Sequence, residues 1–429
     1  MKQVYIFLFV SMFSLYAWSV NLPNPVVDAI YSDQFKTVQF HPVGKSLEPP
    51  VVFFNNMQQL CLSFDDLSNE VQNLYYTVFH CDRNWKISAI PQEEYLLNFT
   101  DFVLDDYAFS KNTLVKYVNY QLLLPNDDVD IKYSGNWAVV VFNKDHPDEP
   151  LIVKRFFVVE PVVGLDARIR DNRFDVSGGA KQEIDFVLSK NGFQVRNPRT
   201  DLKVVVSQNF RFDNAVSNLN PLFDDEKKLE YGLNSEINFT GDNEYRSFEF
   251  REIEFPGRGV ESIKLHRPLY HITLKPDKIR RGERYSSDRE IHGLYRVEMY
   301  RSDYPEVEAD YMMVHFTLKM EQVLAGGGVY VFGALTNREC SKQNEMKWNP
   351  EENQYELSLL LKQGYYNYCY AWKDQLSNKI QIGALEGSHT ETENEYRVYV
   401  YYGRNTDRYD RLIGYGVFNS LTNRSYQNR

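Results

Sequence analysis

The stretch LSLLLKQGYYNYCYAW at residues 357–372 decides how this chain is interpreted, together with ETENEYRVYVYYG at residues 391–403. Large side chains occupy every second position of both stretches: Leu357, Leu359, Leu361, Tyr366, Tyr368, Tyr370, Trp372, Tyr396, Val398, Val400 and Tyr402. A period of two residues is typical of a strand with one face in a core. We therefore expect the chain to end in an aromatic-rich antiparallel sheet. Its first hairpin should turn at Lys362, Gln363 and Gly364, where glycine can take a positive φ.

Composition extends this interpretation to the whole chain. The 429 residues are too many for one core, so two to four domains are expected. The 31 Tyr and 28 Phe residues favour pleated, half-buried surfaces and hence β structure. A net charge of −11, with no dense stripe of Lys and Arg, argues against a nucleic-acid partner.

Residues 1–19 have the features of a secretory signal peptide. Lys2 supplies the positive start, residues 4–15 form a mostly apolar core, and Ala17-Trp18-Ser19 is a cleavage site of the small-x-small type. No later stretch is long and apolar enough to span a membrane, and no cysteine follows the cleavage site to carry a lipid anchor. The mature protein is expected to be soluble and exported.

Turn and glycine signals divide the mature chain into three units in series. The first, residues 21–160, has about seven short strands, and the Pro and Gly residues of 160–164 mark a joint. The middle unit, residues 161–324, has long polar segments at 214–243 and 276–290. The glycine run at 326–328 is expected to be a flexible linker that opens the last unit, residues 325–429. The predicted fold is all-β: a string of three immunoglobulin-like β-sandwich domains.

Four cysteines in an exported chain allow three pairings. Cys61 and Cys81 lie in two strand-like runs around the polar turn at 65–69, which we expect to form one hairpin. Theirs is the only disulfide that the pattern favours. No CxxC motif is present to support redox or zinc chemistry of that kind.

The sequence contains no pattern that identifies catalytic, metal-binding or cofactor-binding residues. His80, Cys81 and Asp82 are adjacent, but neighbours in a strand point to opposite faces and cannot converge on one ion. His266 and His271 are five residues apart, which suits neither a helical nor a strand pair of ligands. No G-x-S-x-G motif and no phosphate-binding glycine loop occur. No cofactor is expected, and an exported hydrolase would be supported only by the abundance of Asp and Glu.

A glycan-binding protein is the main alternative. The layout of residues 329–335, followed by Trp348 and residues 360–372, resembles immunoglobulin-like modules attached to starch-active enzymes. Such modules stack exposed aromatic rings on sugars, which here would be Trp348 or Trp372. The same aromatic side chains would equally suit a protein partner.

Four segments resemble a known family: FHCDRNW at 79–85, LLLPNDDVDIKYSGNWAVVVF at 122–142, LLKQGYYNYCYAW at 360–372 and LEGSHTETENEYRVYVYYGRNTDRYDRLIG at 385–414. Together they resemble the plug protein family of the type IX secretion system of Bacteroidota, over residues of about 25–418. The chain departs from the family pattern at Arg83 and Asn84, where small or acidic residues are usual, and at Trp137, where Tyr is usual.

The resemblance implies a non-enzymatic periplasmic protein. It would bind the giant outer-membrane β-barrel translocon of that system and close the periplasmic end of its pore when no cargo is engaged. It would be a monomer within a larger complex, held at the outer membrane through its partner, with loops of the middle unit reaching into the channel. The family provides no map of partner-binding residues, so their identity is unknown at this stage.

Overall fold

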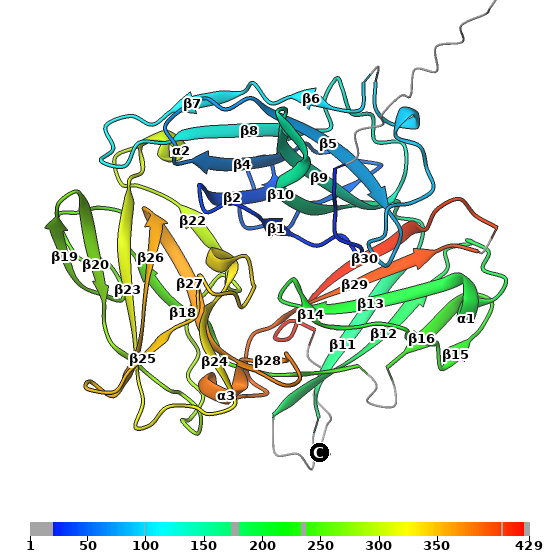
Figure 1. Ribbon diagram of the computed structural model, residues 1–429. Coiled ribbons are helices and arrows are strands. Elements are labelled where there is room, and N and C mark those ends of the chain that lie inside the picture. Colours follow the sequence, from blue (N-terminus) through cyan, green and yellow to red (C-terminus); the bar gives the residue numbers. More distant parts are fainter. Residues whose placement is uncertain (1–19, 98, 173–179, 233–236, 405, 424–429) are drawn as a thin grey trace, which may run out of the picture.

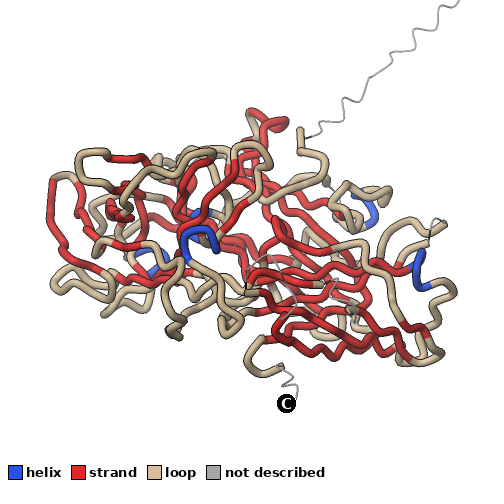
Figure 2. Tube along the Cα trace, turned by 90° about the horizontal axis from the view of Figure 1, so that it is seen from below, coloured by secondary structure: helices blue, strands red, loops and turns tan. Residues whose placement is uncertain are grey.

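The computed structural model describes residues 20–97, 99–172, 180–232, 237–404 and 406–423. The predicted signal peptide at residues 1–19 lies outside them. Six sheets pair into three β-sandwiches, which are arranged as three lobes around a common centre (Figure 1). Helical segments of the described chain are three or four residues long, and strands make up most of the body when it is seen from below (Figure 2). The all-β prediction is confirmed, but the lobes form a triangle where a linear string was expected.

The first lobe comprises residues 20–160. One sheet has the order β1 (Ala29–Ile30), β10 (His146–Val159), β9 (Gly135–Asn143), β5 (Leu74–Cys81), β6 (Phe102–Val103), with β3 (Val51–Phe53) added on β10. The other has the order β2 (Phe35–Pro42), β4 (Leu60–Asp66), β8 (Val118–Leu124), β7 (Tyr107–Phe109). Alternate side chains of both sheets, among them Phe64 and Trp137, fill one core between them.

The expected hairpin around residues 65–69 does not form, because β4 and β5 belong to opposite sheets of this lobe. Two strands that face each other across a core show the same alternation of buried residues as two strands that pair in a hairpin. Cys61 and Cys81 are consequently free thiols. Burial raises the pKa of Cys61 to about 11, with a smaller contribution from the negative charge of Asp106. Burial likewise raises the pKa of Cys81 to about 12, with a smaller contribution from Asp82. Both side chains are therefore protonated and unreactive at neutral pH.

The second lobe is built from two separate parts of the chain, residues 162–240 and 392–423. Its first sheet contains β11 (Gly164–Asn172), β12 (Lys181–Ser189), β16 (Lys228–Tyr231), β15 (Phe223–Asp224) and β17 (Asn238–Thr240). Its second sheet has the order β14 (Arg211–Val216), β13 (Leu202–Gln208), β29 (Glu395–Tyr402), β30 (Arg411–Asn419). The segment 214–243, expected to be a long polar loop, contributes three of these strands and part of a fourth.

The third lobe, residues 244–388, is inserted into the second. One sheet contains β18 (Arg246–Glu249), β27 (Gly364–Asp374), β22 (Tyr295–Val297), β24 (Gly327–Phe332) and β28 (Ile380–Gln381). The other contains β19 (Val260–His266), β20 (Leu269–Leu274), β23 (Tyr311–Lys319), β26 (Gln354–Lys362), β25 (Lys347–Asn349) and β21 (Asp277–Lys278). Stacked aromatic rings such as Phe248 and Tyr366, with centroids 5.2 Å apart, fill the core.

These pairings place the domain boundaries differently from the sequence-based division. The joint at residues 160–164 does separate two sheets, since β10 ends at Val159 and β11 begins at Gly164. The boundary at 324/325 instead runs through the third lobe, because β23 pairs with β26 across it. Gly327 and Gly328 belong to β24, where an added Cβ would collide with the side chains of Trp372 and Tyr330. Close packing, and not linker flexibility, requires glycine there.

The stretch at residues 357–372 does form two strands, but they are not a hairpin. β26 and β27 lie in opposite sheets of the third lobe, and Gln363 carries the chain from one to the other. Gly364 does not adopt a positive φ. Glycine is needed because a Cβ would collide with the backbone carbonyl of Arg296 in the paired strand β22. The stretch at 391–403, expected in the same sheet, supplies β29 to the second lobe.

Candidate functional site

A buried ion pair joins the first lobe to the third. The Nζ atom of Lys362 lies 2.6 Å from Oδ2 of Asp65, and the two side chains are 1% and 0% exposed. Tyr311 of β23 donates a 2.6 Å hydrogen bond to the same carboxylate oxygen, and Asn119 donates to the other at 2.8 Å. Lys362 also donates to the backbone carbonyl of Glu306 at 2.7 Å. The charges are thus enclosed by hydrogen-bonding partners, as buried ion pairs require.

Backbone contacts reinforce the same interface. The carboxylate of Asp310 accepts hydrogen bonds from the amides of Leu114 and Val115 at 2.7 and 3.1 Å. Tyr117 donates to the carbonyl of Ala309 at 2.8 Å. A strand end of the third lobe is therefore fixed against the loop that precedes β8 of the first.

Apolar packing joins the first lobe to the second. Phe157 of β10 and Tyr399 of β29 lie with ring centroids 4.8 Å apart in a buried cluster that contains residues of both lobes. Tyr401 donates a 2.8 Å hydrogen bond to the side chain of Asn136. At the edge of this interface Arg83 pairs with Asp410 at 2.9 Å. An interface with such an apolar core restricts motion between lobes.

Two chain segments that run side by side connect the second and third lobes. The amide of His389 donates to the carbonyl of Asp242 at 2.9 Å, and the Thr392 hydroxyl donates to the same carbonyl at 3.0 Å. Gly241 lies so close to the backbone of His389 that no side chain would fit between the segments. A double connection of this kind resists twisting better than a single linker.

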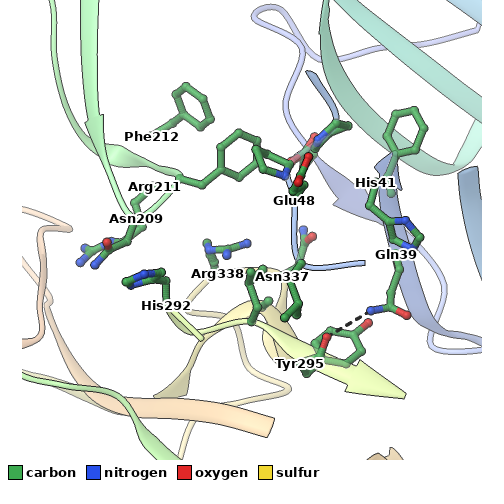
Figure 3. Close-up of a pocket in the computed structure, with 18 of the residues that line it drawn as sticks. Gln39, His41, Glu48, Asn209, Arg211, Phe212, His292, Tyr295, Asn337 and Arg338 are labelled. Atoms are coloured by element: carbon green, nitrogen blue, oxygen red, sulfur yellow. Dashed lines mark hydrogen bonds between the residues drawn. The ribbon is translucent and has the colours of Figure 1, made fainter. Parts of the chain in front are cut away.

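The three lobes line a cavity of about 630 Å³ that is partly open to solvent. The first lobe contributes residues 27–28, part of β2, the segment between β2 and β3, and part of β10. The second contributes the turn between β13 and β14 with the start of β29, and the third contributes residues of 290–295 and 334–339. Figure 3 shows labelled side chains from all three lobes pointing into this space. A cavity of this size is in the range of small-molecule sites.

Charged side chains of both signs line the cavity, and most have local partners. The carboxylate of Asp28 accepts from the Arg155 backbone amide at 2.8 Å and pairs with its guanidinium at 3.3 Å. Asp213 pairs with Arg211 at 2.6 Å. Although burial lowers the pKa of His292, the adjacent carboxylate of Glu290 opposes this effect and raises the pKa overall, with the His292 Nδ1 2.9 Å from that carboxylate.

The backbone around the cavity is unusual. Asn209, Phe210, His292, Asn337 and Arg338 all line it and all have positive φ angles, from 51° to 55°. This left-handed conformation is disfavoured for bulky side chains and costs about 1–3 kcal/mol at such a position. Backbone conformations of this kind gather at functional sites in proteins, which makes the cavity the candidate site.

The residues considered from sequence lie elsewhere. His80 is buried, with Nδ1 2.8 Å from the Ser88 hydroxyl and Nε2 3.1 Å from the Ser134 carbonyl oxygen. Trp348 packs edge-on against Tyr355 with centroids 5.0 Å apart, and Trp372 lies against Gly327. Both tryptophans are half-buried, so neither is an open platform for a sugar ring.

The structure also gathers three histidines that are separate in sequence. The hairpin of β19 and β20 brings the rings of His266 and His271 to 5.1 Å between centroids, and His271 Nδ1 lies 2.8 Å from Nε2 of His315 on β23. Within the described residues, no group of three or more His, Cys, Asp or Glu side chains is arranged to hold a metal ion. None of the helices described is long and apolar enough to cross a membrane.

Comparison with known proteins identifies relatives at two levels. A family model described as "Type 9 secretion system plug protein 1st domain" matches residues 35–160, which form most of the first lobe. A hypothetical protein from Parabacteroides merdae, known from a crystal structure, is 37% identical with a TM-score of 0.88, and the match covers 91% of this chain and 98% of that one. No protein with a curated description matches this chain.

Two other solved structures are more distant. Escherichia coli alpha-2-macroglobulin, spanning domains NIE to MG1, is 14% identical with a TM-score of 0.19, and the match covers 46% of this chain and 97% of that one. The BSP domain of a biofilm-associated protein is 10% identical with a TM-score of 0.16, covering 94% of this chain and 62% of that one.

Proposed function

Because the chain belongs to the plug protein family of the type 9 secretion system, we propose that it is a periplasmic plug. In this proposal it binds the giant outer-membrane β-barrel translocon of that system and closes the periplasmic end of the pore. It acts as a monomer within the larger complex and is held at the outer membrane through this partner. The proposed role requires binding and stiffness, and no catalysis.

The observation that carries the proposal is the closed arrangement of the three lobes. A body that blocks a wide channel must not unravel or stretch when cargo or solvent presses on it. Domains joined only by linkers move relative to one another. Here the buried pair of Lys362 and Asp65, the apolar cluster around Phe157 and the doubled connection near Gly241 hold all three lobes together. The chain is thus a single wide block, as a plug needs.

We further propose that the outer edge of the first lobe contacts the translocon. Exposed apolar side chains gather on this part of the chain: Leu97, Phe99, Val103, Tyr107, Phe109 and Leu123. β6 and β7 lie along the outer edge of the lobe (Figure 1). Apolar side chains concentrated on a surface usually mark a protein contact, and aromatic residues are favoured anchors there.

Affinity isolation tests the partner. Tagged full-length protein is isolated from mildly solubilised outer membranes of its own host, and the associated proteins are identified by mass spectrometry. We expect one very large β-barrel protein in near-stoichiometric amount. Recovery of the chain alone, or with glycan-utilisation proteins, would contradict the plug proposal.

A matched pair of variants tests the contact edge. Phe99, 70% exposed on the first lobe, and Phe255, 65% exposed on the third, are each replaced by Ser. Phe99→Ser should reduce recovery of the barrel, whereas Phe255→Ser should leave it unchanged, and neither should alter the melting temperature. Equal recovery with both variants would place the contact elsewhere.

Pore closure is tested separately by electrical conductance. The purified translocon is inserted in a planar bilayer, and the chain is added from the periplasmic side. Conductance should fall to a low level and recover when the chain is washed out. If the barrel binds the chain but its conductance stays high, the translocon remains the partner and the proposal of pore closure is refuted.

A further inference from the structure

Two arginines at the wall of the central cavity have guanidinium donors that are only partly paired within the described chain. Arg397 of β29 is 5% exposed, and only its Nη2 atom has an acceptor, the carboxylate of Glu395 at 2.8 Å. Its Nε and Nη1 atoms are buried without a hydrogen-bond partner. Unpaired buried donors on a charged group are destabilising by several kcal/mol in general, roughly 1–3 or more each. Their retention at a cavity wall points to a ligand.

Arg338 adds a second unmatched cation. Figure 3 shows its side chain extending into the middle of the cavity, and within the described chain its guanidinium has neither a hydrogen-bond acceptor nor an ion-pair partner. Burial, the largest effect, lowers the pKa of Arg338, and the nearby cations Arg397 and Arg211 act in the same direction. Tyr245 and Asp28 act in the opposite direction, so the guanidinium lies among charges of both signs.

The two guanidinium groups are placed around one aromatic ring. The Cζ atom of Arg397 is 5.5 Å and that of Arg338 is 5.9 Å from the ring centroid of Phe210. Because Phe210 and Arg338 both have the left-handed backbone conformation, the chain adopts a disfavoured geometry to present them together. The result is an apolar surface flanked by two planar sets of N–H donors.

The acidic residues of the cavity do not fill this role. Asp28 pairs with Arg155 and Asp213 with Arg211. The carboxylate of Glu339 is hydrogen-bonded by the side-chain amide of Asn337 at 3.4 Å, and burial raises its pKa. Of the other acids that line the cavity, Glu48 pairs with Lys45, Glu395 with Arg397, and Glu290 with His292 through one oxygen, while the second oxygen of Glu290 is buried without a partner. None of these contacts reaches Arg338 or the Nε and Nη1 atoms of Arg397.

From this arrangement we propose that the cavity binds a small organic oxyanion, a carboxylate or phosphate joined to an apolar body. Guanidinium groups match the planar or tetrahedral oxygens of such anions with paired, charge-assisted hydrogen bonds. The apolar body lies against Phe210, and the volume of about 630 Å³ accommodates a molecule of that size. Since all three lobes line the cavity, the ligand bridges them and stabilises the closed triangle.

The test uses full-length protein and four probes: benzoate, phenyl phosphate, inorganic phosphate and the neutral benzamide. Melting temperature and titration calorimetry are measured for each. Benzoate or phenyl phosphate should raise the melting temperature and bind with a stoichiometry of one, and benzamide should do neither. If inorganic phosphate binds as strongly as phenyl phosphate, the apolar body contributes nothing to affinity and that part of the proposal is wrong. No stabilisation by any of the anions would overturn it.

Two variants distinguish a binding arginine from a structural one. Arg338→Gln should weaken binding of the best anion by about tenfold to a hundredfold, as expected for one charge-assisted contact. Without ligand it should melt no lower than the unmodified protein, because it removes a half-buried charge that makes no ion pair within the described chain. Arg301→Gln, at a side chain 77% exposed, is the matched control and should bind normally. Equal affinity of both variants would overturn the assignment, whatever the result of the translocon experiments.

Discussion

Replacing Lys362 by Met tests whether the buried pair holds the first and third lobes together. Met has a similar length and keeps the aliphatic packing near Tyr117, whose ring centroid lies 4.1 Å from Nζ. The substitution leaves the carboxylate of Asp65 fully buried with hydrogen bonds from Tyr311 and Asn119 but without a cation. Removing one partner of a buried ion pair destabilises by about 3–5 kcal/mol.

The free energy of unfolding is measured by urea denaturation monitored by tryptophan fluorescence. Lys45→Met is the control, because Lys45 pairs with Glu48 on the exposed surface. It should change the free energy of unfolding by less than about 1 kcal/mol. In the double variant Lys362→Met with Asp65→Asn, the stranded charge is gone, so about 2 kcal/mol should be recovered relative to Lys362→Met alone.

The reasoning fails if Lys362→Met is no more destabilising than Lys45→Met. It also fails if the effects at positions 362 and 65 simply add, because independent effects would mean that the two side chains do not interact energetically. A loss of cooperativity, with a separate transition for one lobe, would support the pair as a link between lobes.

Three further outcomes are expected. Burial lowers the pKa of His80 from 6.5 to about 4, so between these pH values the unfolded chain binds a proton that the folded chain does not. The free energy of unfolding should therefore fall by about 3 kcal/mol as the pH drops through this window. In His80→Gln, the difference between the urea midpoints at pH 7 and pH 4.5 should be smaller than in the unmodified protein. Gly364→Ala should destabilise by about 1–3 kcal/mol through collision with Arg296; Gly383→Ala, where a Cβ meets only ordinary contacts, should be near neutral, and equal melting temperatures would contradict the packing argument. A chain ending at residue 390 lacks β29 and β30 and should be insoluble; a soluble, cooperatively folding product would show that these strands are dispensable.

Individual strands could be predicted because their signal is local. The alternation at residues 357–361 and 396–402 corresponds to β26 (Gln354–Lys362) and β29 (Glu395–Tyr402). Alternation reports that one face of a strand is buried, and it says nothing about which strand lies beside it. That is why β4 and β5, and likewise β26 and β27, were paired as hairpins when they face each other across a core.

The candidate site was beyond prediction for a related reason. Its residues come from turns of three lobes, where no periodicity marks a buried position. Arg338 belongs to the third lobe, whereas Arg397 and Phe210 belong to the second. The two guanidinium groups therefore meet at Phe210 only because the lobes pack together. Asparagine tolerates left-handed backbone, so Asn209 and Asn337 offered a faint signal, but asparagine is also common in ordinary turns.

The insertion of the third lobe into the second dictates an order of maturation. A ribosome delivers a chain from its N-terminus, so the first lobe is complete while most of the sequence is still to come. β13 then waits for β29, which follows the entire third lobe. The second lobe, and with it the triangle, closes last. A partly synthesised chain is therefore never a finished triangle.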